Sequence, residues 1–192
     1  MSIQTLYEKG CRLYTEGRYR EAESVFSACL KQLPDNPDIL NAIGSTRELL
    51  GQLDHASTDL EKACRLQPES APFHYNFANL LRKMGKLERS ERHYLEAIQL
   101  NPTLVDAYHG LGSLCLESGR LVTAESCLCK AVELSPGFVL ALHDLGQLYL
   151  LEGKRGQAEE LFRRCLELDR GFVPALNSLG MLLLRGSRVQ EA

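Results

Sequence analysis

Apolar residues recur along the chain with the spacing of an amphipathic helix. They return at i, i+3, i+4 and i+7, as in Leu142, Leu145 and Tyr149, and residues so spaced share one face of an α-helix. The pattern repeats with a period of 34 residues, the interval between Gly17 and Gly51. A fixed period of this length indicates stacked copies of one helical unit.

Several positions hold the same kind of residue in successive copies. Glycine recurs at Gly17, Gly51, Gly85, Gly119 and Gly153, and proline at Pro34, Pro68, Pro102 and Pro136. A small residue recurs at Ala22, Ala56, Ser90, Ala124 and Ala158, followed four residues later by Phe26, Leu60, Tyr94, Leu128 and Phe162. The glycine predicts the left-handed residue that ends a first helix. The proline predicts the end of a second helix, because proline cannot continue the hydrogen-bond ladder.

A further small position falls in the middle of each first helix, at Gly10, Gly44, Ala78, Gly112, Gly146 and Gly180. Glycine inside a helix costs about 1 kcal/mol relative to alanine. Its repeated use predicts that the backbone of a second helix approaches closely.

Each repeat is therefore expected to be two helices of about fourteen residues joined by a short turn. The expected repeats cover residues 3–36, 37–70, 71–104, 105–138 and 139–172, with a partial repeat at 173–192. The partial repeat is expected to end within the turn before its second helix. All repeats are expected to form one domain, residues 1–192.

This order of small, large apolar and proline positions resembles the tetratricopeptide repeat (TPR) family over essentially the whole chain. The resemblance implies an all-α fold, a right-handed α-α superhelical solenoid of helix-turn-helix repeats. In that family the first helix of each pair lines a concave groove, and each repeat buries its apolar face mainly against its neighbours.

Two arginines and the last apolar run depart from the regular pattern. Arg47 stands where Leu13 and Leu81 stand in other repeats, and Arg155 also replaces leucine. We expect both guanidinium groups to extend into solvent. The apolar residues at the far end have no second helix to cover them, which allows self-association through that helix. These residues are Leu179, Leu182, Leu183 and Leu184.

Composition narrows the classes of partner. The net charge is −3 and no basic stripe is present, which argues against nucleic acid. No apolar run is long enough to span a membrane, and the first residues lack the apolar region of a signal peptide. The seven cysteines are an odd number without zinc-site spacing, so we expect a reducing, cytoplasmic location.

The sequence contains no motif of an enzyme or a metal site, so we expect a protein that is not an enzyme and holds no metal or cofactor. Cys127 and Cys129 would point about 200° apart on a helix. His109 and His143 occupy the same position in successive repeats, roughly 10 Å apart by helix spacing. The adjacent side chains of His143 and Asp144 are not expected to face each other.

The face of the first helices that the resemblance assigns to the groove is rich in uncharged polar and aromatic side chains. A simple solvated face would carry more lysine and glutamate, so we favour a ligand groove whose residues are not needed by the core. Side-chain amides and hydroxyls can bond a peptide backbone, and tyrosines offer rigid apolar contact. The candidate groove residues are Tyr7, Asn41, Ser45, Tyr75, Asn76, Asn79, Arg82, His109, Ser113, His143, Asp144, Gln147 and Asn177.

The leading interpretation is a non-catalytic protein–protein interaction scaffold that binds a peptide or protein in this groove. The alternative is the N-terminal targeting or regulatory repeat module of a larger enzyme, such as a glycosyltransferase or sulfotransferase. The cationic residues by which chaperone-binding repeats clamp a terminal carboxylate are missing. The asparagine ladder of the O-linked N-acetylglucosamine transferase repeats is matched only by Asn76.

Overall fold

The computed structural model describes residues 2–190, with side chains described as far as Leu184. Within these residues the fold is all-α and contains eleven helices. The first six are α1 (Ile3–Thr15), α2 (Tyr19–Gln32), α3 (Pro37–Leu49), α4 (Leu53–Leu66), α5 (Ala71–Lys83) and α6 (Leu87–Leu100). The other five are α7 (Val105–Glu117), α8 (Leu121–Leu134), α9 (Val139–Leu151), α10 (Arg155–Leu168) and α11 (Val173–Gln190).

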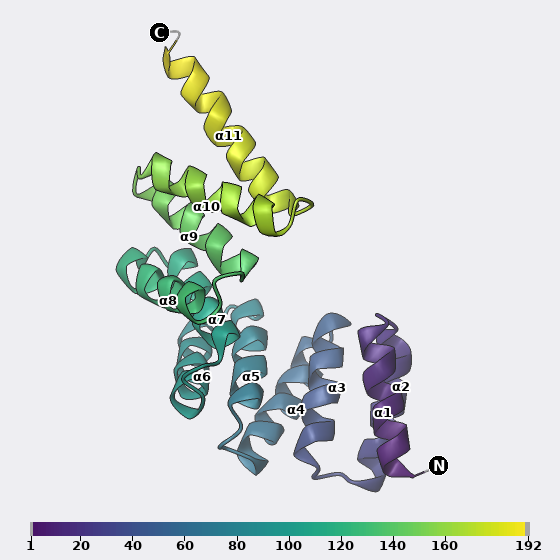
Figure 1. Cartoon of the computed structure of the whole chain (residues 1–192). Helices are drawn as coiled ribbons and strands as arrows, with labels where there is room; N and C mark the ends of the chain where they lie inside the picture. Colours follow the sequence, from purple (N-terminus) through teal and green to yellow (C-terminus); the bar gives the residue numbers. More distant parts are fainter. Residues whose placement is uncertain (1, 191–192) are drawn as a thin grey trace. The chain divides into compact units, whose positions relative to one another are not determined.

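The helices form antiparallel pairs, as Figure 1 shows for α1 with α2 and for α3 with α4. The odd-numbered helices, called A helices below, begin at the six positions that the period predicts. The even-numbered helices, called B helices, are 14 residues long. The helix-turn-helix repeat expected from the sequence is therefore confirmed.

Contacts between the helices divide the chain into two compact units, Met1–Leu104 and Val105–Ala192, called unit 1 and unit 2. Within each unit every helix packs against the one before it, and each A helix also contacts the next A helix. The two units are described separately below. A single solenoid over residues 1–192 stays a prediction.

The turn inside each pair depends on glycine. Gly17, Gly51, Gly85, Gly119 and Gly153 all have positive φ, between 71° and 77°. In residues with a side chain this left-handed conformation brings Cβ against the backbone. The glycine at this position is therefore required by the turn, as the sequence predicts.

The glycines in the middle of the A helices accommodate a side chain. A methyl group added to Gly10 would lie 2.5 Å from Cε1 of Phe26, and one added to Gly146 would lie 2.6 Å from Cε1 of Phe162. The expected approach of a second backbone is therefore wrong: the nearest atoms belong to the large residue of the B helix. In α11, which has no B helix here, no described atom lies within 4 Å of such a methyl group on Gly180.

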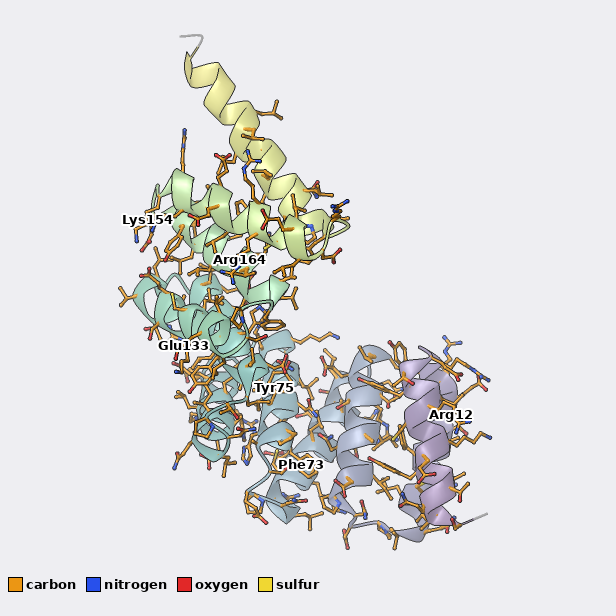
Figure 2. The ribbon with its side chains drawn as sticks, viewed as in Figure 1. Arg12, Phe73, Tyr75, Glu133, Lys154 and Arg164 are labelled. Atoms are coloured by element: carbon orange, nitrogen blue, oxygen red, sulfur yellow. The ribbon has the colours of Figure 1, made fainter. Side chains whose placement is uncertain are left out.

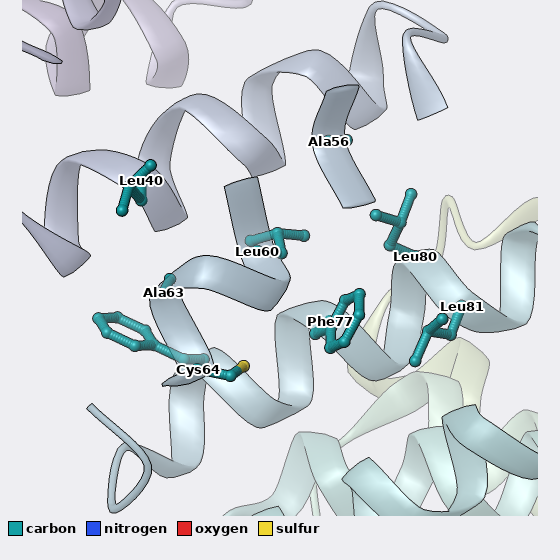
Figure 3. Packing of buried hydrophobic residues seen from close by; sticks show 9 residues of the cluster. Leu40, Ala56, Leu60, Ala63, Cys64, Phe77, Leu80 and Leu81 are labelled. Atoms are coloured by element: carbon teal, nitrogen blue, oxygen red, sulfur yellow. The ribbon is translucent and has the colours of Figure 1, made fainter. Parts of the chain in front are cut away.

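The core of unit 1 lies between successive pairs as well as within them (Figure 3). Leu40 of α3, Leu60 of α4 and Phe77 of α5 are almost completely buried in one cluster. Small residues of α4, such as Ala63, fill the space between these large ones. Each repeat therefore depends on its neighbour for burial, as expected for stacked repeats.

Arg47 does not extend into solvent, so that prediction is wrong. Its Nε lies 3.0 Å from Oε1 of Glu23 on α2, and its Nη1 lies 2.6 Å from Oδ2 of Asp59 on α4. The arginine side chain is only 21% exposed. Two carboxylates on flanking B helices give the guanidinium partners inside the protein. Arg155 is exposed, as expected.

The last helix also differs from expectation. α11 continues to Gln190 without the predicted turn. Ser187 stands at the position where the five preceding repeats have the left-handed glycine. That conformation is unfavourable for a residue other than glycine. Leu179 and Leu182 are partly buried against the cluster around Phe162, so they are covered by their own unit. Leu183 and Leu184 are exposed, as predicted.

Candidate functional site

All thirteen predicted groove residues lie on A helices. Unit 1 holds Tyr7, Asn41, Ser45, Tyr75, Asn76, Asn79 and Arg82. Unit 2 holds His109, Ser113, His143, Asp144, Gln147 and Asn177. Figure 2 labels Arg12 on α1 and Tyr75 on α5, which are two of the three A helices of unit 1.

An open pocket lies on the A helices of unit 1. Its cavity volume is about 250 Å³, and three predicted residues, Asn41, Ser45 and Asn76, line it. The other lining residues are Cys11, Tyr14, Thr15, Phe26 and Ala42. The buried ring of Phe26 reaches this pocket from α2. The pocket therefore combines an apolar lining with amide and hydroxyl groups.

The two amides in this pocket bond to each other. Nδ2 of Asn76 donates to Oδ1 of Asn41 across 2.9 Å. This leaves the Nδ2 of Asn41 as a donor and the Oδ1 of Asn76 as an acceptor, and neither atom has another bonding partner among the described residues. One donor beside one acceptor is what a peptide bond of a ligand requires.

Other predicted residues of unit 1 are already engaged. Tyr7 packs on Phe26 with ring centroids 5.7 Å apart, and burial raises the pKa of Tyr7 to about 12. Oδ1 of Asn79 accepts a hydrogen bond of 2.6 Å from the hydroxyl of Tyr94, a fully buried residue of α6. The expectation that the core does not need the groove residues is therefore wrong for Asn79. Tyr75 lies near Tyr94, with ring centroids 6.3 Å apart.

In unit 2 the predicted residues form a connected polar cluster. Oδ2 of Asp144 accepts from the hydroxyl of Ser113 at 2.6 Å and from Nε2 of His109 at 3.0 Å. Nδ1 of His143 lies 3.4 Å from Oδ1 of Asp144. The prediction that His143 and Asp144 do not face each other is therefore wrong, although Asp144 otherwise bonds to α7 and His143 to Ser178 of α11. Ser113, although predicted to line a groove, is buried.

The cluster continues to α11. Nε2 of Gln147 donates to Oγ of Ser178 at 3.0 Å, and Nε2 of His143 lies 3.2 Å from the same oxygen. Asn177 is exposed on α11. We refer to His109, Ser113, His143, Asp144, Gln147 and Ser178 as the polar cluster of unit 2.

Hydrogen bonds determine the charge state of Asp144. Burial alone would raise the pKa of its carboxyl group. The hydrogen bonds from His109, His143 and Ser113 outweigh that effect and hold the pKa well below its ordinary value. Asp144 is therefore a carboxylate at neutral pH.

A separate cavity of about 300 Å³ lies on α5 and α6, lined by His74, Arg89, Arg92, His93 and Glu96. Nε2 of His74 donates to the carbonyl oxygen of Pro68 at 2.9 Å, so its Nδ1 accepts from Nδ1 of His93 at 3.0 Å. Burial, followed by the positive charges nearby, lowers the pKa of His93 to about 4. This pair was not predicted from the sequence, although His74 stands where Leu40 and Leu142 stand in other repeats.

Three further residues, Tyr14, Thr15 and Ser178, were not predicted as site residues either. Tyr14 and Thr15 follow Cys11 by three and four residues, the spacing that places them on the same helix face. Ser178 is the sixth residue of its A helix, like Asn76 and Asp144. Among the described residues no group of three or more histidine, cysteine or acidic side chains is arranged to hold a metal ion.

Three models of tetratricopeptide repeats match the chain, over residues 7–71, over 78–119, and over 105–138 with 139–172. The chain therefore belongs to the tetratricopeptide repeat family. No significant match to a curated protein was found. In the part of the chain that the structure describes, no helix has the length and apolarity needed to cross a membrane.

Solved structures of other repeat proteins are similar to this chain. MamA is 27% identical with a TM-score of 0.72, covering 84% of this chain and 94% of its own. TTC0263, a thermophilic TPR protein of Thermus thermophilus, is 22% identical with a TM-score of 0.80, covering 95% and 100%. YrrB, described as a TPR protein with an unusual peptide-binding site, is 19% identical with a TM-score of 0.69, covering 90% and 89%.

Proposed function

We propose that this chain is a non-catalytic protein-interaction module whose A helices bind an extended segment of a partner protein. The observation that carries this proposal is the pocket of unit 1, where an apolar lining meets the amide pair of Asn41 and Asn76. The peptide-binding site named for the similar protein YrrB supports the same class of ligand. The alternative, a targeting module of a larger enzyme, would use the same surface.

The pocket suggests how such a segment binds. An apolar side chain of the ligand enters the cavity beside Phe26 and Cys11 and is thereby removed from contact with water. A peptide bond of the ligand then accepts from Nδ2 of Asn41 and donates to Oδ1 of Asn76. Each such hydrogen bond contributes about 0.5–1.5 kcal/mol net to binding. The amide pair would orient the backbone of the ligand, and the pocket would select its side chain.

The test is selection of binders from a library of random peptides, followed by calorimetric titration of the best peptide. We expect the double substitution Asn41→Ala and Asn76→Ala to weaken binding by about 10- to 100-fold. Gln99→Ala, which removes an exposed amide from the B helix α6, is the matched control and should bind normally. Equal affinity of the double variant and the wild type would refute the proposal. Asn79 is left unchanged because it supports Tyr94.

We further propose a cytoplasmic location, which is supported by seven cysteines that form no disulfide in the described residues. Self-association through α11 stays a prediction. Light scattering over a dilution series tests it, and a monomer at every concentration would contradict it.

A further inference from the structure

Among the described residues, the ion contacts of the Asp144 carboxylate are with histidines alone. Its side chain is 26% exposed, and the two groups that form ion contacts with it are the imidazoles of His109 and His143. No lysine or arginine of the described residues pairs with it. Two other partly buried carboxylates, Asp59 and Glu48, each pair with a basic side chain. The hydrogen bonds to Asp144 offset the burial of its carboxylate, and a cation would in addition neutralise its charge.

Every hydrogen bond of the polar cluster can be made by an uncharged donor. The hydroxyl of Ser113 and the Nε2–H of His109 both donate to Oδ2 of Asp144. His143 accepts at Nε2 from Ser178 or Gln147 and so carries its proton on Nδ1, toward Oδ1 of Asp144. These donors orient the carboxylate and leave its net charge in place. Oδ1 can accept a further hydrogen bond, since its one contact among the described residues is the long one of 3.4 Å.

The A helices α7 and α9 do not supply that donor. They carry three acidic residues, Asp106, Glu117 and Asp144, and no lysine or arginine. α11, the third A helix of unit 2, carries Arg185 and Arg188, which lie outside the residues whose side chains are described. The face formed by α7 and α9 therefore carries a negative charge.

From this charge we infer that the A-helix face of unit 2 binds the cationic side chain of an arginine or lysine in the partner segment, with Asp144 as its acceptor. The inference rests on the proposed function, because it assigns the ligand chemistry of a peptide site. His109 and Ser113 act as positioning residues that aim Oδ2. A charge-assisted hydrogen bond to this carboxylate contributes more than a neutral one, so this contact selects among peptides.

The experiment uses a library of random peptides selected in parallel on the wild-type protein and on Asp144→Asn, which keeps the shape and one acceptor oxygen. On the wild type we expect arginine or lysine to be enriched at one position, and on the variant we expect no such enrichment. The selected peptide should bind Asp144→Asn about 10- to 100-fold more weakly. Asp106→Asn, which removes an exposed acid from α7, is the control and should behave as the wild type.

A peptide with citrulline in place of the enriched arginine separates charge recognition from a folding defect. On the wild type it should lose the same 10- to 100-fold, and on Asp144→Asn it should bind like the arginine peptide. Peptides selected without a cationic position, or with one that does not depend on Asp144, overturn this inference and leave the proposed function standing. If no peptide binds either protein, both are overturned.

Discussion

Substitution of Gly146 by alanine tests the close contact between an A helix and its B helix. The added methyl group would lie 2.6, 3.0 and 3.1 Å from three carbons of the Phe162 ring. These distances are shorter than van der Waals contact, and the ring is completely buried, so it cannot move into solvent. The helix backbone or the ring must therefore shift.

Two effects of opposite sign determine the result. Alanine stabilises a helix interior by about 1 kcal/mol relative to glycine. Overpacking a core costs about 1–3 kcal/mol, and contact with three atoms of a rigid ring favours the upper part of that range. We therefore expect Gly146→Ala to lower the free energy of unfolding by about 1–2 kcal/mol in total.

Gly180→Ala is the matched control, because Gly180 occupies the same position of its repeat with no described atom near its Cβ direction. It should leave stability unchanged or raise it by up to about 1 kcal/mol. Urea unfolding followed by circular dichroism, with equal m-values, measures both variants. If Gly146→Ala is at least as stable as Gly180→Ala, the steric role of this glycine is refuted.

Two further predictions concern unit 1. The pKa of His93 falls from 6.5 to about 4 on folding. The unfolded chain therefore binds the extra proton first, and up to about 3 kcal/mol of stability present above pH 6.5 is lost as the pH falls toward 4. Urea unfolding from pH 7 to pH 4.5 should show a smaller decline for His74→Leu with His93→Leu, and an equal decline would contradict this. Tyr94→Phe, which removes the hydrogen bond to Asn79, should cost about 1 kcal/mol. The control is Tyr14→Phe, because the Tyr14 hydroxyl makes no hydrogen bond to the described residues, and it should lower the free energy of unfolding by less. Equal losses of stability in the two variants would contradict a stabilising role for the hydrogen bond between Tyr94 and Asn79.

Polar contacts between successive A helices follow a fixed offset in the sequence. The fifth residue of one A helix meets the sixth residue of the next, as in Asn41 with Asn76 and His109 with Asp144. Both pairs are separated by 35 residues, one more than the repeat period. The sequence places all four residues on the correct helix face. Comparing the fifth position with the sixth position of the following repeat would have found both pairs.

The sequence by itself determined the elements of this protein. The positive φ of Gly17 and its equivalents and the helical spacing of apolar residues are local requirements. They determined where each A helix ends and which face it buries. The candidate residues were likewise assigned to one face of the A helices, where the structure has most of them half-buried, Ser113 buried and Asn177 exposed.

The tertiary structure decided which of these side chains remain available to a ligand. Asn79 is taken up by Tyr94, and Arg47 by two carboxylates of neighbouring helices. Asn41 and Asn76 keep a free donor and a free acceptor beside the pocket. Such partners come from different helices, and their distances depend on how the helices pack. Helical periodicity assigns a residue to a face but does not specify the atom that it meets there.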